Sequence, residues 1–211
     1  MTKAIVVFSG GLDSTTCLAL AQQQHEEVIA LSFDYGQRHA IELQHAKAIT
    51  RDYGLEHIIV KIENNIFQGS ALTDKTLSVP DYSGAASIPV TYVPARNTIF
   101  IAYALGLAES RKASSIYLGV SAVDYSGYPD CRPEYINSYQ ALINQAIVGS
   151  EIKLETPLIN LSKAQTIKLG LSLGVDYSKT FSCYNPDQNG QACGRCDSCK
   201  LRQLGFDNSQ D

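Results

Sequence analysis

Short apolar runs alternate with amphipathic stretches over the first half of the chain. The apolar runs that we expect to form strands lie at 4–8, 27–33, 56–62 and 115–120. Between them, the sequence predicts helices that begin near Asp13 and that cover 38–53 and 98–110. Such alternation with short connections is typical of a parallel sheet that binds ligands beyond the carboxyl ends of its strands. The pattern therefore predicts an α/β, Rossmann-like fold with helices on both faces of the sheet.

The alternation is interrupted at 63–89, where Ser, Gly, Asn and Asp predominate. Irregular segments longer than about 12–15 residues are usually lids, binding loops or disordered inserts. Two interpretations of this insert stay open, a substrate lid and a tolerated surface insertion. Regular structure is expected to return at 90–93.

A glycine-rich turn joins the first strand to the first helix, with the sequence Ser9-Gly10-Gly11-Leu12-Asp13-Ser14. Two glycines let an anion approach the backbone, and the N–H groups and dipole of the following helix favour negative charge. No lysine follows the glycines, so the turn is not a Walker A loop. It resembles instead the pyrophosphate loop of the N-type ATP pyrophosphatases, which implies that Asp13 helps to hold Mg²⁺. An ordinary capped strand-to-helix turn is the plainer alternative.

Length, composition and charge fit one α/β enzyme domain that acts on small molecules. The chain has 211 residues, of which 45% are hydrophobic, and its formal net charge is -4. An acidic chain argues against a protein that binds long stretches of nucleic acid. Because we find neither a signal core nor an apolar segment of about 20 residues, we expect a cytoplasmic protein with no membrane partner.

Four cysteines lie close together near the C-terminus, at Cys183, Cys193, Cys196 and Cys199, in what we expect to be a loop. Closely spaced C-x-x-C pairs favour metal ligation over disulfides in a reducing compartment. Four thiolates suit a structural Zn²⁺ ion, although an iron–sulfur cluster also uses four cysteines. A role for one of these thiolates as a sulfur carrier is a further alternative.

A polar and aromatic segment follows the strand at 115–120, where ligands of such folds bind. Its carboxylates and arginine could hydrogen-bond a heterocycle or a carboxylate, and its tyrosines could stack on a flat ring. The alternative is a strand-to-helix loop in which aspartates cap and Pro133 starts the next helix. The residues that we expect to bind substrate are Asp124, Tyr125, Tyr128, Asp130 and Arg132.

Taken together, five motifs resemble those of the 7-cyano-7-deazaguanine synthases. Besides the glycine-rich turn and the four cysteines, they are Asp34-Tyr35-Gly36-Gln37-Arg38-His39, Val93-Pro94-Ala95-Arg96-Asn97 and the segment from 123 to 132. Ala95 stands where this motif often has glycine, so the backbone conformation there is a point for the structure to decide. The resemblance spans the chain. It implies an adenine nucleotide alpha hydrolase-like fold, with an ATP pyrophosphatase-type domain over 1–180 and a zinc-binding segment over 181–211 packed on it.

The resemblance also implies a reaction in queuosine biosynthesis. ATP would adenylate 7-carboxy-7-deazaguanine, ammonia would displace AMP to give an amide, and a second ATP would convert the amide to the nitrile. The implied cofactors are Mg²⁺ with ATP and one structural Zn²⁺ per chain, and the implied assembly is a homodimer.

Residue roles follow from the matched motifs. We expect Asp13, Arg96 and Lys163 to be catalytic, with Lys163 exposed in the first turn of a helix capped by Ser162. A solvated lysine is the alternative there, and His39 is either a general base or a scaffold residue. The residues expected to bind ATP are Phe8, Ser9, Gly10, Gly11, Leu12, Asp13, Ser14, Thr15, Thr16, Arg96 and Asn97.

Two other functions share part of these features. A tRNA-thiolating ATP pyrophosphatase would have the same phosphate loop, but it should carry a basic RNA-binding extension and a sulfur-carrying cysteine, for which Cys131 is the candidate. A non-enzymatic, zinc-containing nucleotide-binding module would not turn ATP over to AMP and pyrophosphate.

Overall fold

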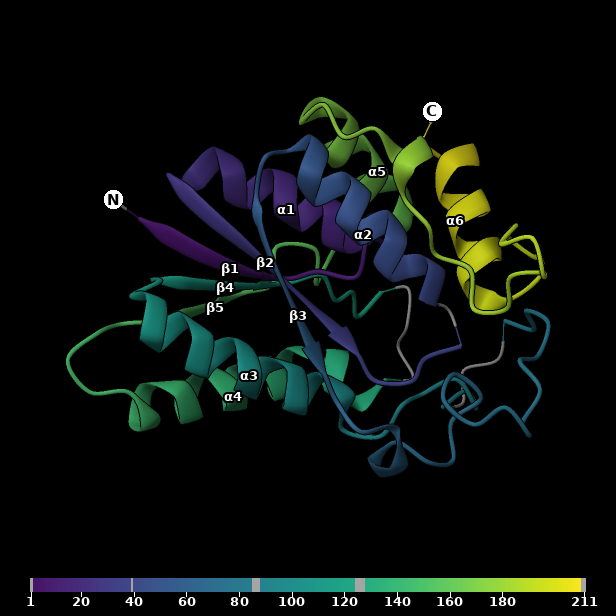
Figure 1. Ribbon diagram of the computed structural model, residues 1–211. Coiled ribbons are helices and arrows are strands. Elements are labelled where there is room, and N and C mark those ends of the chain that lie inside the picture. The colour runs from purple at the N-terminus through teal and green to yellow at the C-terminus, as the bar shows by residue number, and fades with distance from the viewer. Residues whose placement is uncertain (1, 39, 85–87, 124–127, 210–211) are drawn as a thin grey trace.

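Five parallel strands form the centre of the protein (Figure 1). The computed structural model describes residues 2–38, 40–84, 88–123 and 128–209. The strand order is β3-β2-β1-β4-β5. The strands are β1 (Lys3–Val7), β2 (Glu27–Asp34), β3 (Glu56–Lys61), β4 (Ser115–Leu118) and β5 (Lys153–Glu155). The predicted parallel α/β fold is confirmed.

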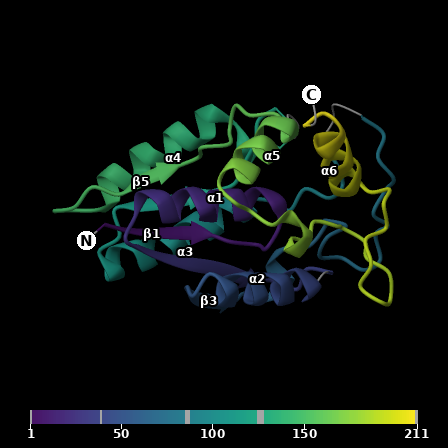
Figure 2. The ribbon, with the colours of Figure 1, turned by 90° about the horizontal axis from the view of Figure 1, so that it is seen from above.

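Helices cover both faces of this sheet (Figures 1 and 2). On one side lie α1 (Leu12–Gln24) and α2 (Ala40–Asp52), and on the other lie α3 (Arg96–Arg111) and α4 (Pro133–Ala146). Farther out, α5 (Lys163–Ser172) packs on α1, and α6 (Asp197–Asp207) packs on α5. Three short 3₁₀ helices complete the described elements: η1 (Asn64–Ile66), η2 (Pro129–Cys131) and η3 (Tyr177–Lys179). Within the described residues, no helix is both long and apolar enough to cross a membrane.

The two faces of the sheet bury alternate residues of the same strands. In β1, Ile5 and Val7 pack in the core on the side of α3, whereas Ala4 and Val6 pack on the side of α1 and α2. A strand that is buried on both faces has no polar side to show, which explains the uninterrupted apolar runs of the sequence. Val7 pairs with Leu31 of β2 and with Leu118 of β4, so β1 and β4 end at one level while β2 continues to Asp34.

Some elements differ from the sequence-based expectation. The segment 90–93 forms turns rather than a regular element. The short edge strand β5 escaped prediction because two of its residues, Lys153 and Glu155, are charged. The cysteine segment is not entirely a loop, because α6 begins directly after Cys196 and places Cys199 in its first turn. Asp197 in that turn complements the helix dipole.

The insert at 63–89 is anchored to the rest of the fold. Phe67 and Leu72 belong to the hydrophobic core. Arg38 donates hydrogen bonds from Nη2 to the carbonyl oxygens of Asp74, at 2.7 Å, and of Leu77. At its far end, the N–H of Tyr82 donates to the carbonyl oxygen of Arg195 in the cysteine segment, at 2.9 Å. The described part of the insert therefore packs into the molecule and connects it to the cysteine segment.

Candidate functional site

A cavity of about 210 Å³ opens beyond the carboxyl ends of β1, β2 and β4. Its wall combines the glycine-rich turn at 9–14, here called the phosphate loop, with the turn after β2 and the start of α3. The segment after β4 and parts of the cysteine segment, residues 181–211, complete it. Residues that the sequence nominated and that line it are Phe8, Ser9, Gly11, Leu12, Asp13, Ser14, Arg96, Asn97 and Tyr128. The structure thus brings together candidates from motifs that lie far apart in the chain.

The phosphate loop is held tightly against α2. Gly10 has φ +81°, and a Cβ at this position would lie 2.7 Å from the backbone nitrogen of Ala46. A side chain is therefore excluded both by conformation and by space. No side chain caps α1 by the usual hydrogen bond, and the N–H of Leu12 donates to the Ser182 hydroxyl at 3.3 Å. The backbone N–H groups at the start of α1 suit an anion.

Thr15 and Thr16, which we expected to bind ATP, are buried and do not line this cavity. The Thr15 hydroxyl donates to the Gly11 carbonyl oxygen at 2.8 Å, and the Thr16 hydroxyl donates to the Leu12 carbonyl oxygen at 3.0 Å. Thr16 also shares a hydrogen bond of 2.7 Å with the Tyr177 hydroxyl. Both side chains thereby support the start of α1 from within.

Lys163 is not exposed, contrary to the expectation for a first-turn lysine. Lys163 is only 7% exposed, and its Nζ donates to both carboxylate oxygens of Asp13 at 2.7 and 2.8 Å. Asp13 neutralises the charge that the start of a helix disfavours. Ser162 and Gln165 form the predicted cap as a complete capping box. The cap aims α5 so that Lys163 reaches the phosphate loop.

Arg96 and Asn97 start α3 at the cavity wall. Arg96 Nη1 donates to the Tyr35 hydroxyl at 3.4 Å, and the guanidinium lies 5.8 Å from the centre of the Phe100 ring. Burial acts to lower the pKa of Arg96, but Tyr35 and further partners raise it, so the group stays a cation. Its charge is available to a phosphate or a carboxylate. Asn97 donates from Nδ2 to the Asp130 carbonyl oxygen at 3.4 Å.

The predicted substrate residues separate in the structure. Tyr128 lines the cavity and shares a hydrogen bond of 3.1 Å with the Thr91 hydroxyl. Asp130 is buried, and its carboxylate accepts from the N–H of Asn97 at 3.3 Å, so it positions the start of α3. Arg132 is exposed and precedes α4, away from the cavity lining. Asp124 and Tyr125, like the candidate base His39, lie outside the described residues.

Several cavity residues had no role assigned from the sequence. The turn after β2 contributes Tyr35 and Gln37, and α2 contributes Glu42. Burial raises the pKa of Glu42 to about 8, although Arg96 opposes the shift. Tyr35 and Gln37 belong to the motif at 34–39, which carried the family resemblance without a role for its single residues. Nothing in the sequence marks Glu42 as an inward-facing residue.

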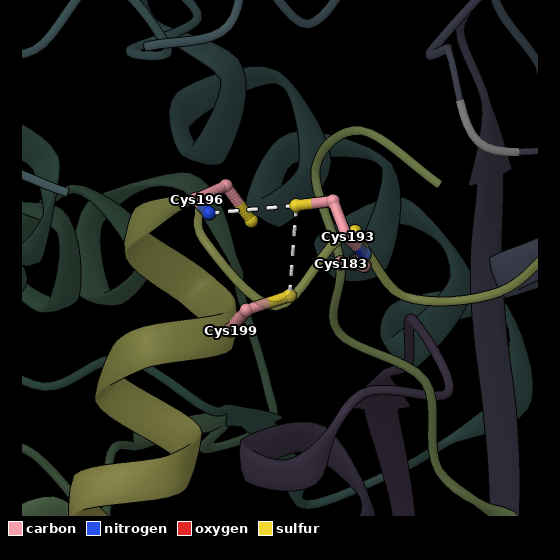
Figure 3. A group of neighbouring side chains, drawn as sticks. All are labelled: Cys183, Cys193, Cys196 and Cys199. Atoms are coloured by element: carbon pink, nitrogen blue, oxygen red, sulfur yellow. Dashed lines mark hydrogen bonds between the residues drawn. The ribbon is translucent and has the colours of Figure 1, made fainter. Parts of the chain in front are cut away.

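The four cysteines converge as predicted (Figure 3). Their Sγ atoms all lie within 4.8 Å of one another, and those of Cys193 and Cys199 are 4.0 Å apart. Hydrogen bonds from the Cys183 and Cys199 thiols lower the pKa of Cys196, as expected where a thiolate forms. Four sulfurs this close fit ligation of a single metal ion, whereas in a four-iron cluster each cysteine binds a different iron atom.

The cysteine cluster also builds part of the cavity. Ser182 and Tyr184 flank Cys183, Ser198 lies between Cys196 and Cys199, and all three non-cysteine residues line the cavity. The phosphate loop contacts the same segment, because the N–H of Phe181 donates to the Gly10 carbonyl oxygen at 3.1 Å. A metal bound to the cysteines would therefore hold one wall of the cavity.

Comparison with known proteins gives consistent results. Residues 3–210 match the family described as queuosine biosynthesis protein QueC. A 7-cyano-7-deazaguanine synthase from Coxiella burnetii is 58% identical, with 98% of this chain and 93% of the relative covered. One from Legionella pneumophila is 56% identical, with 98% and 92% covered.

Among solved structures, the U34-tRNA thiolase NcsA from Methanococcus maripaludis with its [4Fe-4S] cluster superposes with a TM-score of 0.52 at 15% identity. The match covers 99% of this chain and 66% of that chain. At this identity, the likeness concerns the fold alone.

Proposed function

The chain belongs to the QueC family of queuosine biosynthesis proteins, and from this membership we propose how the cavity carries out the reaction. The chain is an ATP-dependent enzyme of queuosine biosynthesis with the function of a 7-cyano-7-deazaguanine synthase. The observation that carries the mechanistic proposal is the joining, in one cavity, of a phosphate loop with polar and aromatic residues from β2, α3 and the cysteine segment.

The chemistry begins with a carboxylate, whose oxygen is too poor a leaving group for ammonia to displace directly. A carboxylate oxygen of 7-carboxy-7-deazaguanine attacks the α-phosphorus of ATP, and pyrophosphate leaves. Ammonia then displaces AMP to give the amide. The amide oxygen attacks the α-phosphorus of a second ATP and pyrophosphate leaves, after which loss of AMP and of the two nitrogen protons gives the nitrile. Most of the catalysis is then positioning of the reactants and stabilisation of charge.

The phosphate loop and α3 supply the groups that receive the nucleotide. The N–H groups at the start of α1, with the hydroxyls of Ser9 and Ser14, hold the departing pyrophosphate. At the start of α3, the Arg96 cation and Asn97 contact the phosphate or adenylate. Asp13 and Lys163 stay paired beside the loop, where they fix its position.

Two metal ions belong to this proposal. Mg²⁺ is usually held by one or two carboxylates together with substrate phosphates, and Asp13 is the carboxylate that the phosphate loop offers. Bound with ATP, it would screen phosphate charge. At the four cysteines, the close approach of all sulfurs supports one structural Zn²⁺ ion. The same view treats 181–211 as a metal-stabilised segment packed on an ATP-binding domain of residues 1–180.

Sulfur transfer to tRNA is less well supported by the cavity. Cys131 lies outside the group of four cysteines and lines the cavity. Burial raises the pKa of this thiol to about 12, and the neighbouring Asp130 adds to the shift. A sulfur carrier needs a thiolate, so Cys131 is poorly suited to that role. The homodimer, which rests on the family resemblance, and the cytoplasmic location are also part of our proposal.

Reconstitution of the reaction tests the proposed function. Purified protein is incubated with Mg-ATP, ammonium and 7-carboxy-7-deazaguanine, and deazaguanine and nucleotide products are followed by mass spectrometry. We expect the nitrile together with AMP and pyrophosphate. Intact carboxylate in the presence of folded, metal-loaded protein would exclude the proposal.

A further inference from the structure

Glu42 lies in the first turn of α2 and lines the cavity together with Arg96 and Tyr35. Its place relative to the phosphate loop is fixed by close backbone packing. A Cβ built at Gly10 would lie 2.9 Å from the Glu42 carbonyl oxygen and 2.7 Å from the Ala46 nitrogen. The helix that carries Glu42 therefore lies in direct backbone contact with the loop.

The Glu42 carboxyl makes no hydrogen bond or ion pair within the part of the chain that the structure describes. Burial raises its pKa to about 8, and the Arg96 charge limits the rise. Near neutral pH the group thus exchanges readily between its acid and base forms. A group with these properties in a cavity is suited to proton transfer.

Other titratable groups face the same cavity or the groups around Glu42, and each is engaged or has its pKa displaced. Asp13 is paired with Lys163, and Asp130 accepts from the Asn97 N–H. Burial raises the pKa of the tyrosines at 35 and 128 and that of Cys131. Tyr184 and Asp130 act on the charge of Arg96. Within the described lining, Glu42 is thus the carboxyl group without a partner.

The proposed reaction requires removal of protons from nitrogen. The amide carries two N–H bonds, and both are lost on the way to the nitrile. Once the amide oxygen bears AMP, loss of the first proton gives a neutral imidate. Loss of the second accompanies cleavage of the C–O bond, and the released N–H electron pair becomes the third C–N bond while AMP leaves with the C–O pair.

We propose that Glu42 is the general base that accepts a proton from the substrate nitrogen in the step from adenylated amide to nitrile. The inference rests on the proposed function. The carboxylate of Glu42 takes the proton, becomes a carboxylic acid and returns the proton to solvent after AMP has left. No oxidant, reductant or further reactant is needed.

The test starts from the amide, 7-amido-7-deazaguanine, because this half-reaction involves no ammonia and its rate is free of ammonium titration. For the wild-type protein, we expect kcat to rise with pH and to level off above about 8, as Glu42 becomes a carboxylate. Glu42→Gln keeps the size of the side chain but cannot accept the proton. It should lower kcat about 100-fold or more, abolish the rise with pH and leave KM for the amide little changed.

Glu109→Gln is the matched control, since Glu109 is an exposed glutamate near the far end of α3. It should keep the wild-type kcat and pH profile. Binding of a non-hydrolysable ATP analogue to Glu42→Gln, measured by calorimetry, shows whether the cavity is intact, and we expect the wild-type Kd.

The possible outcomes separate the two levels of the proposal. A Glu42→Gln enzyme that retains kcat and the pH dependence would overturn the role of Glu42 while the proposed function stands. A raised KM with unchanged kcat would likewise overturn it and would assign Glu42 to substrate binding. A wild-type enzyme that converts neither carboxylate nor amide would overturn the proposed function and this inference with it.

Discussion

At Ala95, a residue with a β-carbon adopts the left-handed conformation that glycine favours, with φ 53° and ψ 20°. The next residue is Arg96, so this turn sets the direction from which the guanidinium enters the cavity. The left-handed region costs an L-residue roughly 1–2 kcal/mol. The motif can therefore be satisfied by alanine, but at a cost in stability.

Ala95→Gly should increase the free energy of unfolding by about 1 kcal/mol, because glycine adopts this conformation without steric strain. The Ala95 side chain is exposed, so little packing is lost. Urea denaturation measures the change. Ala102→Gly, at an exposed position within the same helix, is the control and should instead lower stability by about 1 kcal/mol. If both changes lower stability, the strain at Ala95 is absent.

The sequence allowed the prediction of residues that act through the backbone or in local patterns. The phosphate loop and the four cysteines are such cases, because short-range spacing determines where their atoms lie. Lys163 and Glu42 are different, since their environments depend on which helix packs where. The sequence places Lys163 correctly at the start of a helix but cannot reveal that it forms an ion pair with Asp13, far away in the chain.

At the scale of elements, the same limit applies to α6. Its helical pattern is weak because Gly205 interrupts it, yet this glycine allows α6 to approach α5 closely. A Cβ at Gly205 would lie 2.4 Å from Cγ of Lys163 and 2.9 Å from Cδ1 of Ile167. The contact therefore links the cysteine segment to the ion pair beside the phosphate loop.

Gly205→Ala should destabilise the protein by about 1–3 kcal/mol and lower turnover, because the new methyl group displaces Lys163. Thermal unfolding and the rate of AMP formation measure the two effects. Gly106→Ala is the matched control, since a Cβ there meets no atom within 4 Å and the residue lies within α3. It should stabilise by up to about 1 kcal/mol without changing turnover. Equal behaviour of the two variants would contradict the proposed contact.

At the scale of the whole molecule, the cavity wall is assembled from both ends of the chain. The phosphate loop comes from the first residues, and Ser182, Tyr184 and Ser198 come from the cysteine segment. The insert contacts the cysteine segment through the ion pair of Asp81 with Arg195, at 3.4 Å. Parallel topology was predictable from the alternation of elements, but the docking of the insert and the cysteine segment depends on contacts that have no periodic signature.

Removal of the metal should therefore affect nucleotide binding as well as stability. We expect the purified protein to contain one zinc ion per chain and to lack the visible absorbance of an iron–sulfur cluster, because all four sulfurs lie within 4.8 Å. Metal analysis and spectroscopy test the identity of the ion. After chelation, the unfolding temperature should fall and an ATP analogue should bind more weakly. Unchanged binding by metal-free protein would show that the cysteine segment does not support the cavity.

The fate of the substrate oxygens tests the central claim most directly. When both carboxylate oxygens of 7-carboxy-7-deazaguanine carry ¹⁸O, two successive adenylations should transfer one label to each of two AMP molecules and leave none in the nitrile. Mass spectrometry of AMP and of the product measures this. Labelled inorganic phosphate formed together with ADP, or unlabelled AMP formed together with nitrile, would contradict activation of the substrate by adenylation.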